Sequence, residues 1–229
     1  MMKKALRFQV LILLFPFCIN AHEPFRDFQT WQNFEFEYSI NKRWLGKLQL
    51  QTRLSENSTR FSYYYIDVGL MYRITRNLRL NADYVYVQKQ RLDMSYSTRH
   101  QYNIYLNYRK KLGRFTFFDR LLTEGQFTDY ATSKNGKQLG DIYLRNKFTI
   151  RCKLISKLTG YIADEIYYRF DGKYYETGFN RNRLSTGLLY KLTDLWLLET
   201  FYIFEDNFNA RRPSQNCILG FGVTKSFYQ

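Results

Sequence analysis

The alternation of apolar and polar residues constrains the fold of this chain more than any other feature. From Phe28 onward, segments of about ten residues with a period of two are separated by polar turns. In residues 101–108, for example, Tyr102, Ile104 and Leu106 alternate with more polar neighbours. Because successive side chains of a β-strand point to opposite faces, each segment has one apolar and one polar face.

The pattern predicts eleven strand segments whose connections alternate between short and long. The segments cover residues 28–40, 44–54, 61–74, 78–88, 99–109, 115–126, 139–153, 159–170, 181–192, 195–205 and 215–228. The short turns are 41–43, 75–77, 110–114, 154–158 and 193–194, and the longer loops include 89–98, 127–138, 171–180 and 206–214. Outer-membrane barrels show this asymmetry, with short periplasmic turns and longer loops outside.

Aromatic residues gather near both ends of the predicted strands. Trp44, Tyr72, Tyr108, Tyr190, Trp196 and Phe227 fall near the short turns, and Tyr64, Tyr84, Tyr86, Tyr102, Tyr168, Tyr202 and Phe204 fall towards the long loops. This distribution is typical of aromatic girdles at the two membrane interfaces. A soluble β-sandwich or lipocalin-like barrel would have turns richer in Gly and Pro, whereas this chain has only 3 Pro. We therefore predict an all-β protein, a transmembrane antiparallel up-and-down β-barrel.

The number of strands is harder to predict. Bacterial single-chain barrels have an even number of strands and both termini in the periplasm, so eleven segments leave one crossing missing. Residues 22–28 could form a short twelfth strand, or the N-terminal segment could thread the lumen. We expect twelve strands, with ten as the alternative.

The first 21 residues predict export. Lys3, Lys4 and Arg7 precede an apolar run over residues 10–19, and the small residue Ala21 follows. This arrangement is typical of a cleavable signal peptide. The apolar run is about half of the roughly 20 residues that a spanning helix needs, so no transmembrane helix is predicted. The expected organisation is a signal peptide over residues 1–21 and an outer-membrane barrel over residues 22–229.

The cysteines indicate neither a lipid anchor nor a metal site. Cys18 follows the bulky Phe17, whereas a lipoprotein signal needs small residues before its cysteine. After cleavage only Cys152 and Cys217 remain, and no C-x-x-C or Cys/His cluster accompanies them. We predict no disulfide, metal or other cofactor.

Two carboxylates break the pattern of apolar outward faces. Asp119 shares the register of Leu121, and Asp164 shares the register of Ile162 and Ile166. A carboxylate that faces lipid is costly. A β-bulge would turn either residue inward, and the sequence does not show where bulges lie.

The polar faces predict a charged lumen with a basic excess. The chain has 35 Lys and Arg against 20 Asp and Glu, and removal of the signal peptide leaves most of this excess. The predicted lumen residues are Arg53, Arg73, Arg79, Arg99, Arg109, Arg145, Lys147, Arg151, Arg169, Arg181, Arg183, Glu35, Glu37, Asp67, Asp83, Glu124, Glu165 and Glu199, together with Lys47 and Lys191.

Two interpretations of this lumen remain open. A wall of Arg and Lys attracts anions, which favours a narrow anion-preferring channel. Arg–carboxylate networks can instead fill a small barrel and leave a structural or accessory protein, and the sequence favours this closed interior. The expected partners are outer-membrane lipid and, in the first case, small anionic solutes; other envelope proteins are further candidates. Export disfavours nucleic acid, and no nucleic-acid partner is expected.

No catalytic group can be assembled from the sequence, so we do not expect an enzyme. Beyond the signal peptide the only histidines are His22 and His100, and His100 shares the apolar register of its strand. One alternative is a surface hydrolase that uses His100 and the loop carboxylates Asp93, Asp129, Asp171 and Asp206. Another is a barrel that binds a ligand or partner through aromatic residues of its outer loops, namely Tyr96, Tyr130, Tyr174, Tyr175 and Phe179.

Several short motifs resemble those of an outer-membrane family, domain of unknown function 2490, which is common in the Bacteroidota. They are Asp27-Phe28-Gln29-Thr30-Trp31, Asn41-Lys42-Arg43-Trp44, Arg99-His100-Gln101, Lys111-Leu112-Gly113-Arg114, and Arg181-Asn182-Arg183-Leu184 running to Gly187-Leu188-Leu189-Tyr190. The resemblance covers nearly all of the chain after the signal peptide. It implies a barrel at the outer membrane and supplies no activity or catalytic residues.

Overall fold

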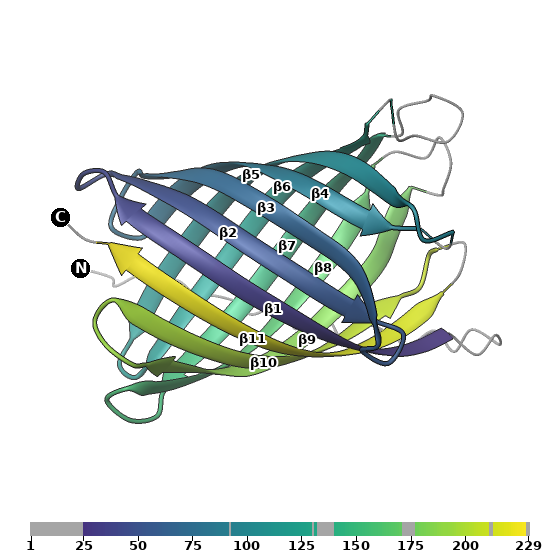
Figure 1. Ribbon diagram of the computed structural model, residues 1–229. Helices are drawn as coiled ribbons and strands as arrows, with labels where there is room; N and C mark the ends of the chain where they lie inside the picture. Colours follow the sequence, from purple (N-terminus) through teal and green to yellow (C-terminus); the bar gives the residue numbers. More distant parts are fainter. Residues whose placement is uncertain are drawn as a thin grey trace, which may run out of the picture.

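The computed structural model describes residues 25–91, 93–129, 131, 140–170, 177–210 and 213–227. Among these residues, eleven β-strands follow one another around a single closed barrel (Figure 1). They are β1 (Phe25–Ser39), β2 (Trp44–Ser55), β3 (Arg60–Arg73), β4 (Leu78–Gln90), β5 (Tyr96–Leu112), β6 (Phe115–Thr128), β7 (Gly140–Lys153), β8 (Leu158–Arg169), β9 (Gly178–Lys191), β10 (Trp196–Asn207) and β11 (Ser214–Phe227). The predicted all-β barrel is confirmed, and each predicted segment corresponds to one strand.

The barrel closes through a parallel pair. Strands β1 and β11 run in the same direction, with register from Phe25 opposite Ser214 to Tyr38 opposite Phe227 (Figure 1). Every other neighbouring pair is antiparallel.

The predicted twelve strands, and the alternative of ten, are wrong. Successive antiparallel strands reverse direction, so the first and last strands of an odd set run parallel, and their direct pairing closes the barrel without another crossing. Residues 25–28 begin β1 rather than forming a separate strand. Residues 22–24 and the predicted signal peptide, including Cys18, lie outside the described residues.

One end of the barrel carries tight turns fixed by local side chains. We call it the short-turn end; it joins β1 to β2, β3 to β4, β5 to β6, β7 to β8 and β9 to β10. Asn41 Oδ1 accepts hydrogen bonds from the backbone N–H groups of Arg43 (2.8 Å) and Trp44 (2.9 Å). Thr75 and Thr193 cap the equivalent turns through their hydroxyl oxygens. Such local bonds explain why these turns are short. The opposite end is called the long-loop end.

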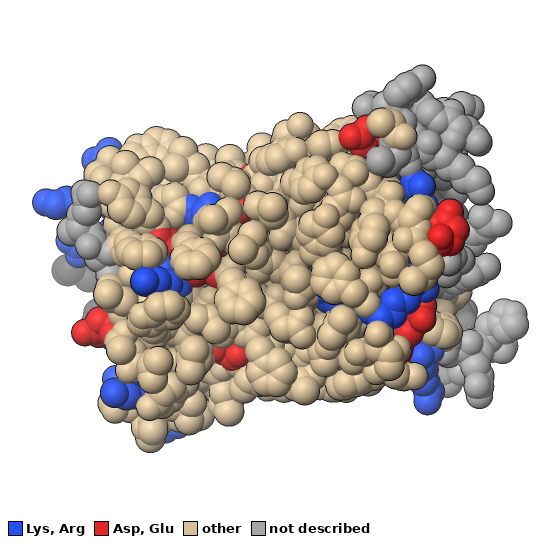
Figure 2. All heavy atoms as spheres, in the orientation of Figure 1, with Lys and Arg blue, Asp and Glu red and all other residues tan. Residues whose placement is uncertain are grey.

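The outer surface of the barrel is an apolar belt. The side chains of Val68, Tyr102 and Ile104, for example, are exposed by 55%, 56% and 58%. A large exposed apolar surface of this kind marks contact with a membrane or another protein rather than with water. On the face seen in Figure 2, most charged atoms lie towards the two ends, and the middle is largely uncharged. Among the residues that the structure describes, no helix is long and apolar enough to cross a bilayer.

Asp119 and Asp164 remain on the outer surface. Register shifts within the described strand pairs occur only beside Leu54 and Tyr168, so no bulge turns either aspartate inward. Each carboxylate instead accepts a hydrogen bond of 2.8 Å from a neighbouring amide, Asn146 for Asp119 and Asn182 for Asp164. Because a side-chain amide is neutral, these bonds supply no positive charge.

The parallel closure predicts a specific cross-link. Phe34 and Val223 lie directly opposite each other on β1 and β11 and both face outward. With Cys152 and Cys217 replaced by Ser, the F34C/V223C protein should form an intramolecular link under oxidation. Non-reducing electrophoresis of the denatured chain would detect it as a more compact, faster band.

The matched control is F34C/L219C. Leu219 lies four residues before Val223 on β11, about 13 Å away along the strand, so this pair should not link. Linking of the control pair in preference to F34C/V223C would contradict the parallel register.

Candidate functional site

The candidate site is the lumen of the barrel. Its cavity has a volume of about 2410 Å³ and is lined by side chains from every one of the eleven strands. The lining reaches Asp93 at the long-loop end and Asp194 at the short-turn end. The alternation read from the sequence places the polar face of each strand on this cavity.

The predicted lumen residues lie along this cavity with two exceptions. The lining includes Arg53, Arg79, Arg99, Arg109, Arg145, Lys147, Arg151, Arg169, Arg181, Arg183, Glu35, Glu37, Asp67, Glu124, Glu165 and Glu199, as well as Lys47 and Lys191. Arg73 is exposed at the short-turn end of β3, where the strand ends before its side chain can enter the lumen. Asp83 faces inward but is covered, because Lys47 and the Tyr105 hydroxyl both bond to its carboxylate.

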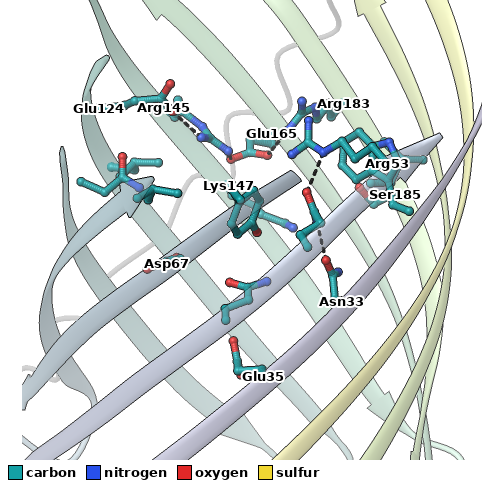
Figure 3. A pocket seen from close by; sticks show the side chains of 18 of the residues that line it. Asn33, Glu35, Arg53, Asp67, Glu124, Arg145, Lys147, Glu165, Arg183 and Ser185 are labelled. Atoms are coloured by element: carbon teal, nitrogen blue, oxygen red, sulfur yellow. Dashed lines mark hydrogen bonds and ion pairs between the residues drawn. The ribbon is translucent and has the colours of Figure 1, made fainter. Parts of the chain in front are cut away.

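A network of arginines and glutamates joins β6 to β10. Arg145 contacts Glu124 at 2.6 Å and Glu165 at 2.7 Å, and Arg183 contacts Glu205 at 2.5 Å and Glu165 at 3.9 Å. Figure 3 shows Arg145, Glu165 and Arg183 side by side on the wall. The three carboxylates are nearly inaccessible to solvent. Charge-assisted bonds of this kind tie neighbouring strands together and hold the arginines in fixed orientations.

Aromatic rings complete this part of the wall. The guanidinium of Arg53 lies 3.8 Å from the ring centre of Trp31, and that of Arg183 lies 5.3 Å from it. The Arg145 guanidinium lies 4.3 Å from the ring centre of Tyr167. Cation–π contacts therefore hold these arginines against the wall, in addition to the ion pairs of Arg145 and Arg183.

A second ionic cluster lies on β2 to β5. Lys47 contacts Asp67 at 2.9 Å and also bonds to Asp83. Gly69 makes room for this cluster, since a Cβ at this position would lie 2.3 Å from Asp83 Oδ1. Two carboxylates around one ammonium group leave this part of the lumen with no positive excess.

A third group, which we call the cationic patch, comprises Arg109, Arg120, Lys147 and Arg151 on β5, β6 and β7. All four line the cavity, and Arg120 lies directly opposite Lys147 in the strand register. Within the described part of the chain, none of the four forms an ion pair with a carboxylate.

The contacts of the cationic patch are neutral. Arg120 Nε donates to the Asn107 side-chain oxygen at 2.9 Å, and Phe118 lies between Arg109 and Arg151, whose guanidinium carbons are 5.8 and 4.6 Å from its ring centre. Arg151 Nε is buried and has no hydrogen-bond partner among the described residues. The patch therefore places positive charge beside neutral groups, with no ion pair to a carboxylate among the described residues.

Two carboxylates mark the rims of the cavity. The Ser95 hydroxyl and backbone N–H donate to Asp93, and these hydrogen bonds lower the pKa of Asp93. The Lys191 ammonium group bonds to Asp194 at 2.5 Å and lowers the pKa of Asp194. Both rim carboxylates therefore stay ionised well below neutral pH.

Sequence reasoning missed Glu205, Arg120 and Trp31 as lumen residues. Glu205 and Arg120 share the inward register of Glu199 and Phe118, so their parity alone could have identified them. Trp31 also has inward parity, but an aromatic side chain in a barrel of this type is expected outside, in the girdles.

Of the described groups considered for catalysis, only Asp93 lies at the cavity. His100 faces outward, with its Nδ1 2.7 Å from the Tyr84 hydroxyl and its Nε2 3.7 Å from Asp129. Asp93 lies at the rim of the cavity and Asp206 on the outer face of β10. His22, Asp171, Tyr130, Tyr174 and Tyr175 lie outside the described residues.

Cys152 and Cys217 are free thiols. The described ranges contain no group of three or more His, Cys, Asp or Glu side chains placed to hold a metal ion.

Comparison with solved structures finds similar β-barrel proteins. A crystal structure of the NanC porin matches with a TM-score of 0.52 and 12% sequence identity, over 82% of this chain and 93% of the porin chain. The β domain of the Bordetella autotransporter BrkA matches with a TM-score of 0.46 and 12% identity, over 79% of this chain and 82% of that domain. At this identity the porin match shows a shared fold and nothing more. No curated protein sequence matches this chain.

Comparison with protein families gives one match, to the model described as "Protein of unknown function (DUF2490)", over residues 28–216. The match covers most of the barrel, from the beginning of β1 to the beginning of β11. The chain therefore belongs to the DUF2490 family.

Proposed function

We propose that the protein is exported to the bacterial outer membrane, spans it with its eleven strands, and passes small anionic solutes through its lumen. The observation that carries the proposal is the cationic patch, Arg109, Arg120, Lys147 and Arg151, which lines the cavity without a carboxylate partner among the described residues.

The membrane location rests on the outer surface and the N-terminal sequence. A closed barrel leaves no backbone edge unpaired, which is a condition for crossing hydrocarbon with strands. The exposed apolar belt and the aromatic residues at both strand ends fit a bilayer and its interfaces. The signal peptide predicted over residues 1–21 would direct export, and the short-turn end would then face the periplasm.

The preference for anions rests on the difference between two kinds of lumen cation. Arg145, Arg183 and Lys47 are neutralised by carboxylates, so they contribute little to the potential along the cavity. The cationic patch has no ion pair with a carboxylate among the described residues and lies between low-dielectric walls, which focus the field onto the cavity. An anion that enters can replace water around these guanidinium and ammonium groups, whereas a cation is repelled.

A non-conducting structural barrel is the second candidate. The observation that favours it is the Arg–Glu network, which crosses the lumen wall from β6 to β10 and satisfies its own charges. Conductance measurements separate the two functions. A channel passes current, whereas a structural barrel passes none and requires only the Arg–Glu network.

The two kinds of cation should differ in their effect on stability. Arg145→Gln leaves Glu124 and Glu165 buried without their main partner, and we expect the free energy of unfolding to fall by about 3 kcal/mol. Arg120→Gln removes no ion pair and should cost under about 1 kcal/mol. Urea unfolding in lipid vesicles, followed by tryptophan fluorescence, measures both. Equal losses for the two variants would show that the network does not stabilise the barrel.

The cationic patch should set ion selectivity. In a planar bilayer with a salt gradient, the purified protein should give discrete current steps, and the reversal potential should indicate that anions permeate more readily than cations. The R120E/K147E variant places two carboxylates in the same wall, so the sign of the reversal potential should change.

The control for this experiment is R76E/K157E, which makes the same change of net charge in exposed short turns outside the cavity lining. It should keep the anion preference, since charges at the rim are more strongly screened by salt. Folded protein that gives no current steps, or R120E/K147E pores that still prefer anions, would refute the channel function.

A further inference from the structure

Three carboxylates of the lumen have no ion pair with any described residue. They are Glu35 and Glu37 on β1 and Glu199 on β10, and all of them line the cavity. Within the described ranges Glu35 has no hydrogen bond either. The Ser226 hydroxyl donates to Glu37 at 2.9 Å. The Tyr161 hydroxyl donates to Glu199 at 2.6 Å. We call these three residues the carboxylate wall.

Strand β11 brings the carboxylate wall together, because it lies between β1 and β10. Glu35 lies opposite Thr224 of β11, and Glu199 lies opposite Gly222, which is the next inward position along the same strand. A Cβ at Gly222 would lie 3.3 Å from Glu199 Oε2, so the glycine leaves room for this carboxylate. The wall is therefore one acidic surface across the strands that close the barrel.

The neighbouring strand β2 places Lys47 directly opposite Glu37 in the register. The Lys47 ammonium group is nevertheless engaged by Asp67 and Asp83. The cation beside the carboxylate wall therefore forms its ion pairs elsewhere.

The carboxylate wall lies across the lumen from the cationic patch. In the closed order of strands, β6 is the middle strand of the patch, and it is separated from β11 by β7 to β10 in one direction and by β1 to β5 in the other. Every member of both groups lies in the half of its strand next to the short-turn end. The two groups of opposite charge therefore face each other in the same part of the cavity.

The two groups interact across the cavity without a direct bond. Arg120 attracts Glu35, and Glu199 attracts Arg151. No described cation of the patch forms an ion pair with the wall. Figure 3 shows Glu35 and Lys147 as separate side chains with no bond between them. The space between the two groups can therefore be occupied by a solute that carries both signs of charge.

We propose that the lumen selects small anions that also carry a protonated amino group, of which an acidic amino acid is the simplest kind. The proposal rests on the anion passage proposed above and names the class of solute for that same cavity. The carboxylates of the solute would bind guanidinium groups of the cationic patch, which pair well with carboxylates. Its ammonium group would donate hydrogen bonds to the carboxylate wall.

The two facing groups explain why both kinds of charge are needed. A solute with carboxylates alone is attracted by the cationic patch but repelled by Glu35 and Glu199, whereas an amine alone is repelled by the patch. Such repulsion of the wrong solute contributes to specificity as much as attraction of the right one. A solute with both groups aligns its dipole with the field between the two walls.

The test measures entry of L-aspartate into vesicles that contain the purified protein at neutral pH. Two comparison solutes lack the ammonium group: malate has a hydroxyl in its place, and succinamate has the same net charge as aspartate. We expect aspartate to enter at least about threefold faster than either, the fold-change that corresponds to one solvent-exposed ion pair. Mass spectrometry of filtered vesicles measures all three solutes.

The E35Q/E199Q variant tests the role of the carboxylate wall, because it removes two charges and keeps the shape of both side chains. The ratio of aspartate entry to succinamate entry should fall to about one. Since these solutes have the same net charge, a general change of potential in the lumen affects them equally. Heat-modifiable migration on electrophoresis reports folding, and E35Q alone, which removes no hydrogen bond with a described residue, should lower the same ratio if the double variant does not fold.

The matched control is D119N/D164N, which makes the same change of net charge on the outer face of the barrel. It should keep the preference for aspartate. Equal entry of aspartate and succinamate through the parent protein, or an undiminished preference in E35Q/E199Q, would overturn the inference and leave the channel in place. Exclusion of all three solutes by inserted protein would refute the channel, and the inference with it.

Discussion

The structure depends on closing the β-sheet, because every strand would otherwise leave a row of unpaired backbone groups at an edge. In this chain the closing pair is β1 and β11, whose parallel register extends from Phe25 to Tyr38. Parallel pairing uses slanted hydrogen bonds that are slightly weaker per residue than antiparallel ones, but it removes both edges at once. An odd number of strands is therefore compatible with a closed wall, and the two ends of the barrel receive different connections.

Closure also sorts the side chains into two environments. Inward residues meet a narrow polar cavity, where charges must be paired or hydrated, and outward residues form the apolar belt. The Arg145–Glu165 and Lys47–Asp67 pairs show the first solution, in which the wall neutralises its own charges. The cationic patch shows the second, in which charge is held by neutral neighbours such as Phe118 and Asn107 and is left to interact with whatever enters. The proposed anion passage and the proposed scaffold therefore coexist in one lumen, and β6 and β7 contribute residues to both.

The sequence predicted the strands and their faces well, because a period of two is a local signal that needs no knowledge of distant residues. It located the lumen arginines and glutamates for the same reason. Strand number was predicted wrongly, since the parallel pairing of β1 with β11 joins residues from the two ends of the chain and has no local signature. The pairing of particular charges, such as Arg183 with Glu205, depends equally on strand register. Asp119 and Asp164 were recognised as exceptions from the sequence, but only the positions of Asn146 and Asn182 on neighbouring strands reveal the amide hydrogen bond that each carboxylate accepts.

Backbone NMR of the folded protein in detergent micelles or lipid nanodiscs tests the closing pair most directly. Parallel closure predicts nuclear Overhauser contacts between β1 and β11 in which both residue numbers rise together, from Thr30 beside Leu219 to Phe36 beside Lys225. Contacts in which the numbers run in opposite directions, or contacts of β1 with an additional strand in place of β11, would contradict the eleven-stranded barrel.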